Sequence, residues 1–288
     1  MSLPTKLSSF FLISNLFISV CVVALCQSSA LLLNVDASHL LPFVFFSTLF
    51  SYNFQRYVRF KSSKNGFSQL EWIRNREWSL KGLTLISLVL SIYYSLSLSV
   101  NSFYILIPAI AITLLYPFSI RFSDYSIRLR ETPRLKIFLI VIVWTIVSVG
   151  LVVVECAVPF SDEVCLLIAS RFFFVFSITI PFDIRDLKYD KHYMKTIPQM
   201  FGVKTSKQIA LWSLALYELM SILHFFVAGF SFSLLIGLLF TSLYVGFLIY
   251  KTNEERSDTF YTFWLEGSSL IMYLLLFIIP LAFGIFAP

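Results

Sequence analysis

The sequence predicts an all-α, polytopic membrane protein with nine transmembrane helices. Hydrophobic residues make up 58% of its 288 residues and charged residues 13%, and a soluble domain carries about twice that share of charge. The apolar residues stand in long continuous blocks, which is typical of membrane spans rather than of soluble helices or strands. The basic residues gather in every second connection between blocks, which indicates a chain that crosses a bilayer repeatedly.

Nine apolar blocks are close to the ~20 residues that a helix needs to cross the hydrocarbon core. They cover residues 9–33, 38–58, 81–99, 102–119, 135–157, 163–183, 206–228, 231–250 and 265–286. No soluble domain or linker stands out, so we expect a single transmembrane domain over residues 1–288. Polar stretches follow the second and sixth blocks, which suggests two four-helix halves, about 9–119 and 135–250, and a ninth helix at 265–286.

The first block has an alternative interpretation as the core of a signal peptide. It contains SFFLISNLFISVCVVALC, in which VALC faintly resembles a lipoprotein cleavage box. The apolar run continues through Leu33, however, and Leu25 precedes Cys26 where cleavage needs a small residue. A first membrane span is therefore the better prediction.

The orientation follows from the basic residues. The N-terminus and the connections after the second, fourth, sixth and eighth blocks hold all of the lysines and arginines except Arg171. The opposite connections are short and carry Asp36, Glu155, Asp162 and Glu163. The positive-inside rule predicts a cytoplasmic N-terminus and an external C-terminus in an integral membrane protein, of the inner membrane if the cell is bacterial. The net charge of +6 then reflects topology and attraction for anionic lipid, not nucleic acid.

Two features outside the spans have open interpretations. The polar stretch 59–80 is either a helix lying in the interface on Leu70, Trp72, Ile73 and Trp78, or a solvated loop anchored by its tryptophans. The four cysteines lack metal-ligand spacing, although Cys156 and Cys165 flank one outer loop and could meet there.

Three aspartates follow the sixth block. Asp183, Asp186 and Asp190 have the spacing i, i+3, i+7 and would share one face of a helix. Like charges this close destabilise one another unless a cation lies between them. One interpretation is a solvated helix, because the basic residues Arg185, Lys188 and Lys191 are interleaved. The other is a Mg²⁺ site, in which one or two carboxylates bind the ion and phosphate oxygens complete its coordination.

The stretch DIRDLKYDKHYMKTIPQMFGVK resembles the second aspartate-rich motif of the UbiA superfamily of intramembrane prenyltransferases. The matching residues are Asp183, Asp186, Asp190, Lys195, Thr196, Pro198 and Gly202. The predicted nine-span topology is similar too, and LRETPRLKIFLIVIVW, with Lys136 and Trp144, looks like the family's entry into helix five. The turn between Asp190 and Thr196 departs from the pattern, since it is one residue shorter and lacks the usual glycine.

The first motif departs further. The stretch that corresponds to the family pattern Asn-x-x-x-Asp-x-x-x-Asp is SYNFQRYVRFKSS. It retains Asn53 but has Tyr57 and Lys61 at the two aspartate positions. The resemblance implies one Mg²⁺ site, with Asp183, Asp186 and Asp190 as catalytic residues and metal ligands. The predicted contacts of a substrate diphosphate are Asn53, Arg56, Arg59, Lys61, Lys136 and Lys195. Arg56, Arg59 and Lys61 could bind phosphate directly in place of the second ion, or they are ordinary positive-inside residues.

The function expected from this resemblance is transfer of a prenyl group from a polyprenyl diphosphate to a membrane acceptor in lipid or quinone-type metabolism. Pyrophosphate leaves, and aromatic faces stabilise the allylic cation that remains. The aromatic residues near the two motifs are Tyr52, Phe54, Phe182 and Tyr189.

Two alternatives remain open. The first is a degenerate, non-catalytic protein that binds a prenyl-phosphate lipid. The second is a transporter or structural membrane component, which would use the intramembrane residues Arg171, Glu218 and His224. Arg171 and Glu218 could instead form a structural ion pair. Asp258 and Glu266, which flank the start of the ninth span, resemble the family's last acidic loop.

Overall fold

A computed structural model describes residues 14–62, 77–122, 125–128, 132, 134–188, 190 and 192–284, with the side chains of residues 59–62, 119–122, 125–128 and 192 left out. This part of the chain forms nine main helices, some of them composite, and a separate 3₁₀ turn, η4 (His192–Met194). The first five are α2 (Leu16–Leu32); η1 (Ser38–Leu40) with α3 (Leu41–Ser62); α5 (Glu77–Ser95); α6 (Val100–Leu115); and α7 (Leu135–Thr145), η3 (Ile146–Gly150) and α8 (Leu151–Glu155). The remaining four are α9 (Asp162–Asp186), α10 (Ile197–Ala228), α11 (Phe232–Lys251), and η5 (Phe260–Leu265) with α12 (Ser268–Ala282).

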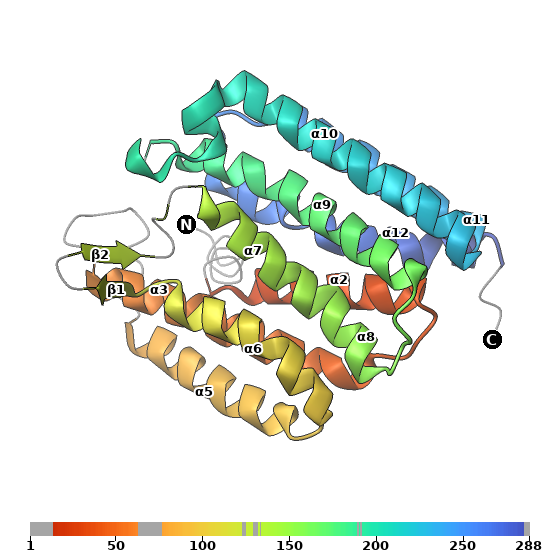
Figure 1. The fold of residues 1–288 in the computed structure, drawn as a ribbon, viewed down its shortest axis with the longest axis horizontal. Helices are drawn as coiled ribbons and strands as arrows, with labels where there is room; N and C mark the ends of the chain where they lie inside the picture. Colours follow the sequence, from red (N-terminus) through yellow and green to blue (C-terminus); the bar gives the residue numbers. More distant parts are fainter. Residues whose placement is uncertain are drawn as a thin grey trace, which may run out of the picture.

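The helices form one closed bundle with roughly aligned axes (Figure 1). Helix α2 packs against α3 and α12, and α3 packs against α5 and α6. The contacts then continue from α6 to α7 and α8, from α7 to α9, and onward through α10 and α11 to α12, where the ring closes. The prediction of an all-α fold of nine helices is confirmed.

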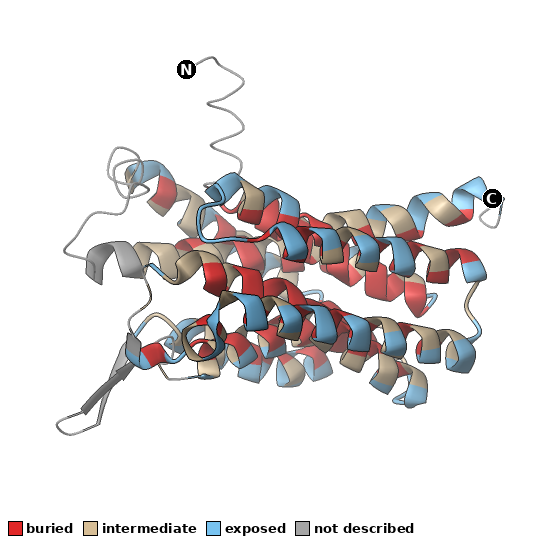
Figure 2. Cartoon of the chain, turned by 90° about the horizontal axis from the view of Figure 1, so that it is seen from above, coloured by how far each residue is buried: buried red, intermediate tan, exposed pale blue. Residues whose placement is uncertain are grey.

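The burial pattern is that of a bundle with an apolar exterior. Buried residues line the inner faces of the helices, and exposed residues follow the outer faces (Figure 2). Many of the outward residues are large and apolar, among them Trp212 and Phe226, which are 73% and 75% exposed. Soluble monomers rarely expose so many large apolar side chains, and an exterior of this kind is suited to contact with lipid.

Five of the described helices are long and apolar enough to cross a membrane. They cover Leu135–Glu155, Asp162–Asp186, Ile197–Ala228, Phe232–Lys251 and Phe260–Ala282. Two further apolar helices, Leu16–Leu32 and Val100–Leu115, are shorter. These spans support an integral membrane protein, while the orientation of the chain remains a prediction.

The structure shifts the starts of two predicted spans. Helix α10 begins at Ile197 rather than 206, because Thr196 and Gln199 form a capping box and Pro198 stands in the first turn. Gly202, with φ 77° and ψ 165°, breaks the helix one turn later. The ninth helix begins with the π-helical turn η5 at Phe260 rather than at 265. Hydropathy locates neither start because both first turns contain polar residues.

A short antiparallel hairpin, β1 (Ser119–Phe122) and β2 (Tyr125–Arg128), was not predicted and connects α6 to α7. The proposed interfacial residues Leu70, Trp72 and Ile73 lie outside the described residues, and Trp78 is 84% exposed at the start of α5. All four cysteines are free, so no bond joins Cys156 to Cys165.

Most helical serine and threonine hydroxyls are satisfied within their own helix. They donate to carbonyls three or four residues earlier, at distances of 2.6–3.2 Å in the inner helices. These hydroxyls belong to Ser28, Ser29, Ser170, Ser177, Thr179, Ser221 and Thr241. In a bilayer, each polar group needs such a partner because no water is available.

The predicted orientation can be checked with reporter fusions. Fusions after Met200 and Asn253 are expected to give a cytoplasmic signal, because the connections that contain them carry the basic residues. A fusion after Pro288 is expected to give an external signal. Paired phosphatase and fluorescent-protein reporters at each position supply internal controls. A cytoplasmic C-terminus would contradict the nine-span topology.

Candidate functional site

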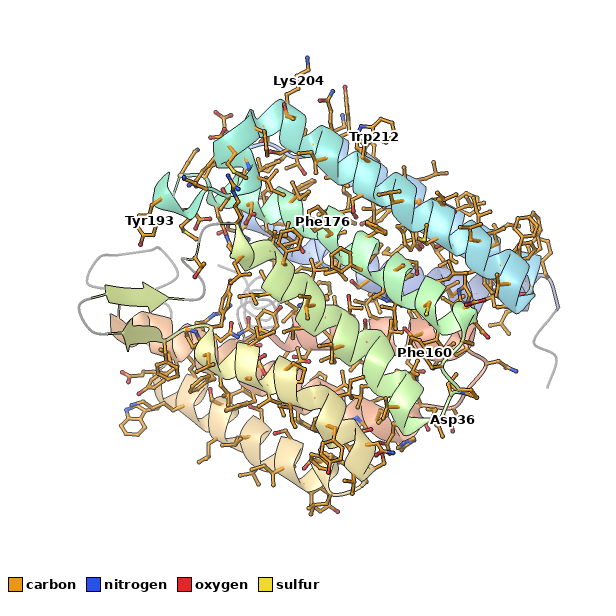
Figure 3. The ribbon with its side chains drawn as sticks, in the orientation of Figure 1. Asp36, Phe160, Phe176, Tyr193, Lys204 and Trp212 are labelled. Atoms are coloured by element: carbon orange, nitrogen blue, oxygen red, sulfur yellow. The ribbon has the colours of Figure 1, made fainter. Side chains whose placement is uncertain are left out.

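The two regions compared with aspartate-rich motifs lie at the same end of the bundle, here called the motif end. The ends of α3 and α9 lie here, together with the beginnings of α2, α7, α10 and η5. Tyr193 and Lys204 mark the motif end in Figure 3, and Asp36 and Phe160 mark the opposite end. Alternation of helix direction therefore brings together residues that are far apart in the sequence.

Lys136 is the centre of the acid cluster formed by Asp183, Asp186 and Asp190. Its Nζ lies 2.9 Å from Asp183 Oδ1, 2.9 Å from Asp190 Oδ2 and 3.8 Å from Asp186 Oδ2. The exposed fractions of the side chains are 10% for Lys136, 3% for Asp183, 6% for Asp190 and 21% for Asp186. The three carboxylates therefore converge on one buried ammonium, and Asp186 is the most accessible of them.

Local backbone contacts explain this convergence. Helix α9 ends at Asp186, and the amide of Asp190 donates to the carbonyl of Asp186 at 2.8 Å, so one further turn connects Asp190 to the end of the helix. Gln199 Nε2 donates to the carbonyl of Asp190 at 3.1 Å and fixes this turn to α10. The amide of Arg134 donates to the carbonyl of Met194 at 3.1 Å, which joins the same connection to the start of α7. Lys136 is thereby placed opposite the acids.

Arg185 supplies a second cation and was not among the predicted site residues. Its Nε lies 2.8 Å from Asp186 Oδ1. Its guanidinium also lies over the rings of Phe182 and Tyr261, with centroid distances of 5.1 and 5.5 Å. In the sequence, Arg185 is one of the basic residues that alternate with the aspartates. Its contact with Tyr261 could not be predicted there, because Tyr261 belongs to a distant helix.

The fit of this cluster to a metal ion depends on the coordination mode. In the part of the chain that the structure describes, no group of three His, Cys, Asp or Glu residues could hold a metal ion on its own. Lys136 already lies where Asp183 and Asp190 converge. The hard oxygen atoms of Asp186 and Asp190 still fit Mg²⁺ in its usual mode, which takes one or two carboxylates together with phosphate oxygens of a substrate.

Asn53, the retained residue of the first motif, and Arg56 are bonded to the two residues that precede α2. Asn53 is fully buried, accepts a hydrogen bond from Asn15 Nδ2 at 2.8 Å and donates to the carbonyl of Ser14 at 3.0 Å. Arg56 Nη2 donates to Asn15 Oδ1 at 2.8 Å. Asn15 has a left-handed backbone with φ 64°, which an asparagine tolerates, and it was also missed by the sequence reasoning. Asn15 therefore positions both Asn53 and Arg56.

The other predicted substrate-binding residues are only partly placed. Arg59 and Lys61 belong to the last turns of α3, but their side chains lie outside the described part of the structure. Lys195 is exposed, with φ 46°, and no hydrogen bond or ion pair joins it to the acid cluster in the described residues. Among the aromatic candidates, Tyr52 accepts a hydrogen bond from Trp144 Nε1 at 3.2 Å, and Tyr189 lies outside the described residues.

The intramembrane polar residues do not belong to this cluster. Arg171 is 2% exposed and donates to Ser29 Oγ at 3.0 Å and to the carbonyl of Leu25 at 3.2 Å, joining α9 to α2. Glu218 accepts a short hydrogen bond from Ser242, so no ion pair between Arg171 and Glu218 forms in the described residues. At the opposite end, His224 lies 3.7 Å from Glu163. These contacts join helices.

No protein-family model matches the sequence, and no curated protein matches it. The fold is nevertheless similar to that of solved UbiA homologues. One from Archaeoglobus fulgidus, bound to GPP and Mg²⁺, matches with a TM-score of 0.65 and 13% identity, over 93% of this chain and 99% of that chain. An apo homologue from Aeropyrum pernix K1 matches with a TM-score of 0.65 and 16% identity, over 90% and 97%.

The Archaeoglobus fulgidus protein has also been solved with DMAPP and Mg²⁺, and that structure gives a TM-score of 0.63 at 13% identity over 93% of this chain and 98% of that chain. The chain described here therefore has a UbiA-like fold. The resemblance suggested by its second motif is confirmed at the level of the fold.

Proposed function

We propose that this protein is an intramembrane prenyltransferase that transfers a prenyl group from a polyprenyl diphosphate to an acceptor in the membrane. The observation that carries the proposal is the buried cluster of three aspartates and Lys136 at one end of a UbiA-like bundle. The diphosphate binds at the motif end, and the prenyl chain lies among the apolar helices. Similar folds have been solved with GPP or DMAPP and Mg²⁺, which supports this class of donor.

In this proposal, Asp186 and Asp190 hold Mg²⁺ together with phosphate oxygens of the donor. The ion supplies stabilisation for the negative charge that develops on the leaving pyrophosphate. Lys136 lies beside both carboxylates and adds positive charge at the same place. Arg56 is held by Asn15 and offers a guanidinium with the fork geometry that suits a phosphate.

Aromatic faces near the cluster are suited to the allylic cation. Phe182 and Tyr261 lie 5.9 Å apart between ring centroids, and each already has the guanidinium of Arg185 over its ring. A ring that receives one cation in this way presents its negative face to that region. The face of each ring that Arg185 does not cover would offer the same attraction to the carbocation left after ionisation.

A second candidate function is non-catalytic binding of a prenyl-phosphate lipid. It is favoured by the same Lys136, because an ammonium already neutralises the acids, and by Tyr57 and Lys61 at the first-motif aspartate positions. Such a protein would bind the donor through its cations without a metal ion.

Purified protein incubated with labelled prenyl diphosphates of several lengths separates the two functions. For the transferase, we expect pyrophosphate release that needs Mg²⁺ and stops with EDTA, and a labelled lipid product when membrane extract supplies the acceptor. Saturable binding without release, unaffected by EDTA, would establish the lipid-binding function. Absence of both release and binding would refute both functions.

A further inference from the structure

A hollow opens on the outer surface of the bundle, between the end of α11 and η5. It has a volume of about 450 Å³, which is within the range of small-ligand sites. The residues that line it are Glu255, Arg256, Ser257, Thr259, Phe260 and Trp264. Tyr261 is fully buried beside Phe182, whereas Trp264 is half-exposed, so these two side chains of η5 face opposite ways. The hollow is therefore separate from the interior of the bundle and shares no residue with the acid cluster.

The connection that forms the hollow is fixed by hydrogen bonds. The side-chain oxygen of Asn253 accepts from the amide of Glu255 at 3.0 Å, and its carbonyl accepts from the amide of Arg256 at 3.4 Å. Arg256 Nε donates to the carbonyl of Lys251 at 3.2 Å, and the guanidinium lies over the ring of Phe260 with a centroid distance of 5.5 Å. The guanidinium is thus held through Nε, and its Nη groups make no hydrogen bond within the described residues.

Glu255 and Arg256 bring opposite charges to the same hollow without neutralising each other. In the part of the chain that the structure describes, no ion pair joins them to each other or to a third residue. The hydroxyl groups of Ser257 and Thr259 line the hollow as well, and each can donate a hydrogen bond to an anion. A carboxylate beside a guanidinium suits a ligand that carries both charges, since each charge then forms a charge-assisted hydrogen bond.

The hollow lies where the lipid-facing surface of the bundle ends. Phe247 and Tyr250 are exposed in the last turns of α11, and Lys251 Nζ lies over both rings at centroid distances of 5.6 and 5.8 Å. The carbonyl of Trp264 accepts from the hydroxyl of Tyr244 at 3.3 Å, which joins η5 to α11. Tryptophan and tyrosine concentrate at the depth of the lipid headgroups, so we expect the hollow to open at that depth.

We propose that this hollow binds the headgroup of a zwitterionic phospholipid with a primary ammonium group, of the phosphatidylethanolamine class. The phosphate contacts the Nη groups of Arg256 and the hydroxyls of Ser257 and Thr259, and the ammonium donates to the carboxylate of Glu255. The glycerol region packs on Trp264. A quaternary ammonium has no hydrogen to donate to that carboxylate, and an acidic headgroup without an amine would oppose it with a like charge. The site takes its ligand from the bilayer and is independent of the proposed function.

Native mass spectrometry of the full chain in detergent tests this site. The protein is titrated with phosphatidylethanolamine, phosphatidylcholine and phosphatidylglycerol that carry the same acyl chains. We expect phosphatidylethanolamine to bind about tenfold more tightly than either of the others, as for one additional charge-assisted hydrogen bond. Equal binding of the lipids, or no binding, would overturn the inference. Tightest binding of phosphatidylglycerol would overturn it too, because it would indicate a merely basic surface.

Two substitutions separate the contributions of the charges. Glu255→Gln should remove the preference for phosphatidylethanolamine over phosphatidylcholine, because the acceptor of the ammonium loses its charge. Arg256→Gln should weaken binding of all the lipids by about tenfold, since they share the phosphate, and Arg256→Lys should recover part of that loss. Both residues are exposed, so these variants are expected to fold as the wild type does. A preference that persists in Glu255→Gln would refute the site.

Glu254→Gln is the matched control. Glu254 is an exposed neighbour with the same charge, and it does not line the hollow, so its replacement should leave the preference intact. Loss of the preference in this variant would show that general surface charge, and not the hollow, selects the lipid. Free phosphoethanolamine distinguishes a lipid from a soluble ligand with the same charges. If it displaces the lipid at equal concentration, the assignment to a phospholipid is wrong.

Discussion

Replacing Lys136 with methionine is expected to lower the free energy of unfolding by about 3–5 kcal/mol, the usual cost of removing one partner from a buried ion pair. Asp183 and Asp190 are almost completely buried, and Lys136 is the cation that both of them contact at 2.9 Å. Methionine preserves the length of the apolar stem and removes only the charge. The measurement is the midpoint of unfolding of the detergent-solubilised protein during titration with sodium dodecyl sulfate.

Two further variants make this test specific. Lys204→Met is the control, because Lys204 lies on the outer surface of α10 at the same end (Figure 3) and its replacement should change stability by less than about 0.5 kcal/mol. The double variant Lys136→Met with Asp183→Asn should recover part of the lost stability, since the most buried carboxylate then no longer needs a counter-charge. Equal stability of Lys136→Met and the wild type would refute this account of the cluster.

Replacing Asp186 with asparagine is expected to abolish Mg²⁺-dependent binding of a short prenyl diphosphate, with a loss of at least about a hundredfold, or 2.7 kcal/mol. Asparagine keeps the size of the side chain but loses the charge of the most accessible carboxylate. Because Mg²⁺ is bound by only one or two carboxylates and the substrate, losing one of them removes much of the site. Calorimetry with and without Mg²⁺ measures the effect.

Folding should be almost unchanged in this variant, because an asparagine oxygen can still accept from Arg185 Nε, and Lys136 keeps its two closer acids. Glu254→Gln is a matched control, since Glu254 is exposed in the connection between α11 and η5, and its replacement should leave binding intact. If Asp186→Asn binds the diphosphate with wild-type affinity and the same Mg²⁺ dependence, the metal assignment is wrong.

Much of the fold could be predicted from the sequence, because hydrophobic blocks of bilayer length leave the backbone few alternatives to helix. Each of the nine blocks corresponds to a helix in the described part of the chain. The starts of α10 and η5 could not be located in this way. They depend on a capping box at Thr196 and on a π-helical turn at Phe260, which are set by hydrogen bonds rather than by hydropathy.

The site was predictable only where its parts are local. Asp183 and Asp186 lie one turn apart in α9, so helical spacing placed these two together. The prediction that Asp190 shares the same helical face was wrong, because the helix ends at Asp186 and a turn fixed by Gln199 brings Asp190 to the cluster. The position of Lys136 at their centre depends on a contact across 54 residues, and the position of Asn15 on one across 38 residues. Such contacts come from the packing of α7 against α9 and of α2 against α3, which no local pattern encodes.

The serine and threonine hydroxyls that bond within their own helices have a consequence for how the bundle is assembled. A hydroxyl already satisfied by a carbonyl of the preceding turn makes no demand on a neighbouring helix, so it neither favours nor penalises any sliding of one helix along another. Rotational and vertical register then come from the packing of buried side chains and from a small number of polar cross-links between helices, such as Arg171 to the carbonyl of Leu25, Ser213 to the carbonyl of Phe173, and Glu155 to Ser102. Substitutions at these cross-links and in the buried core are therefore expected to change how the helices align, whereas the hydroxyls that bond within their own helix can be replaced by groups of similar size with little effect on alignment.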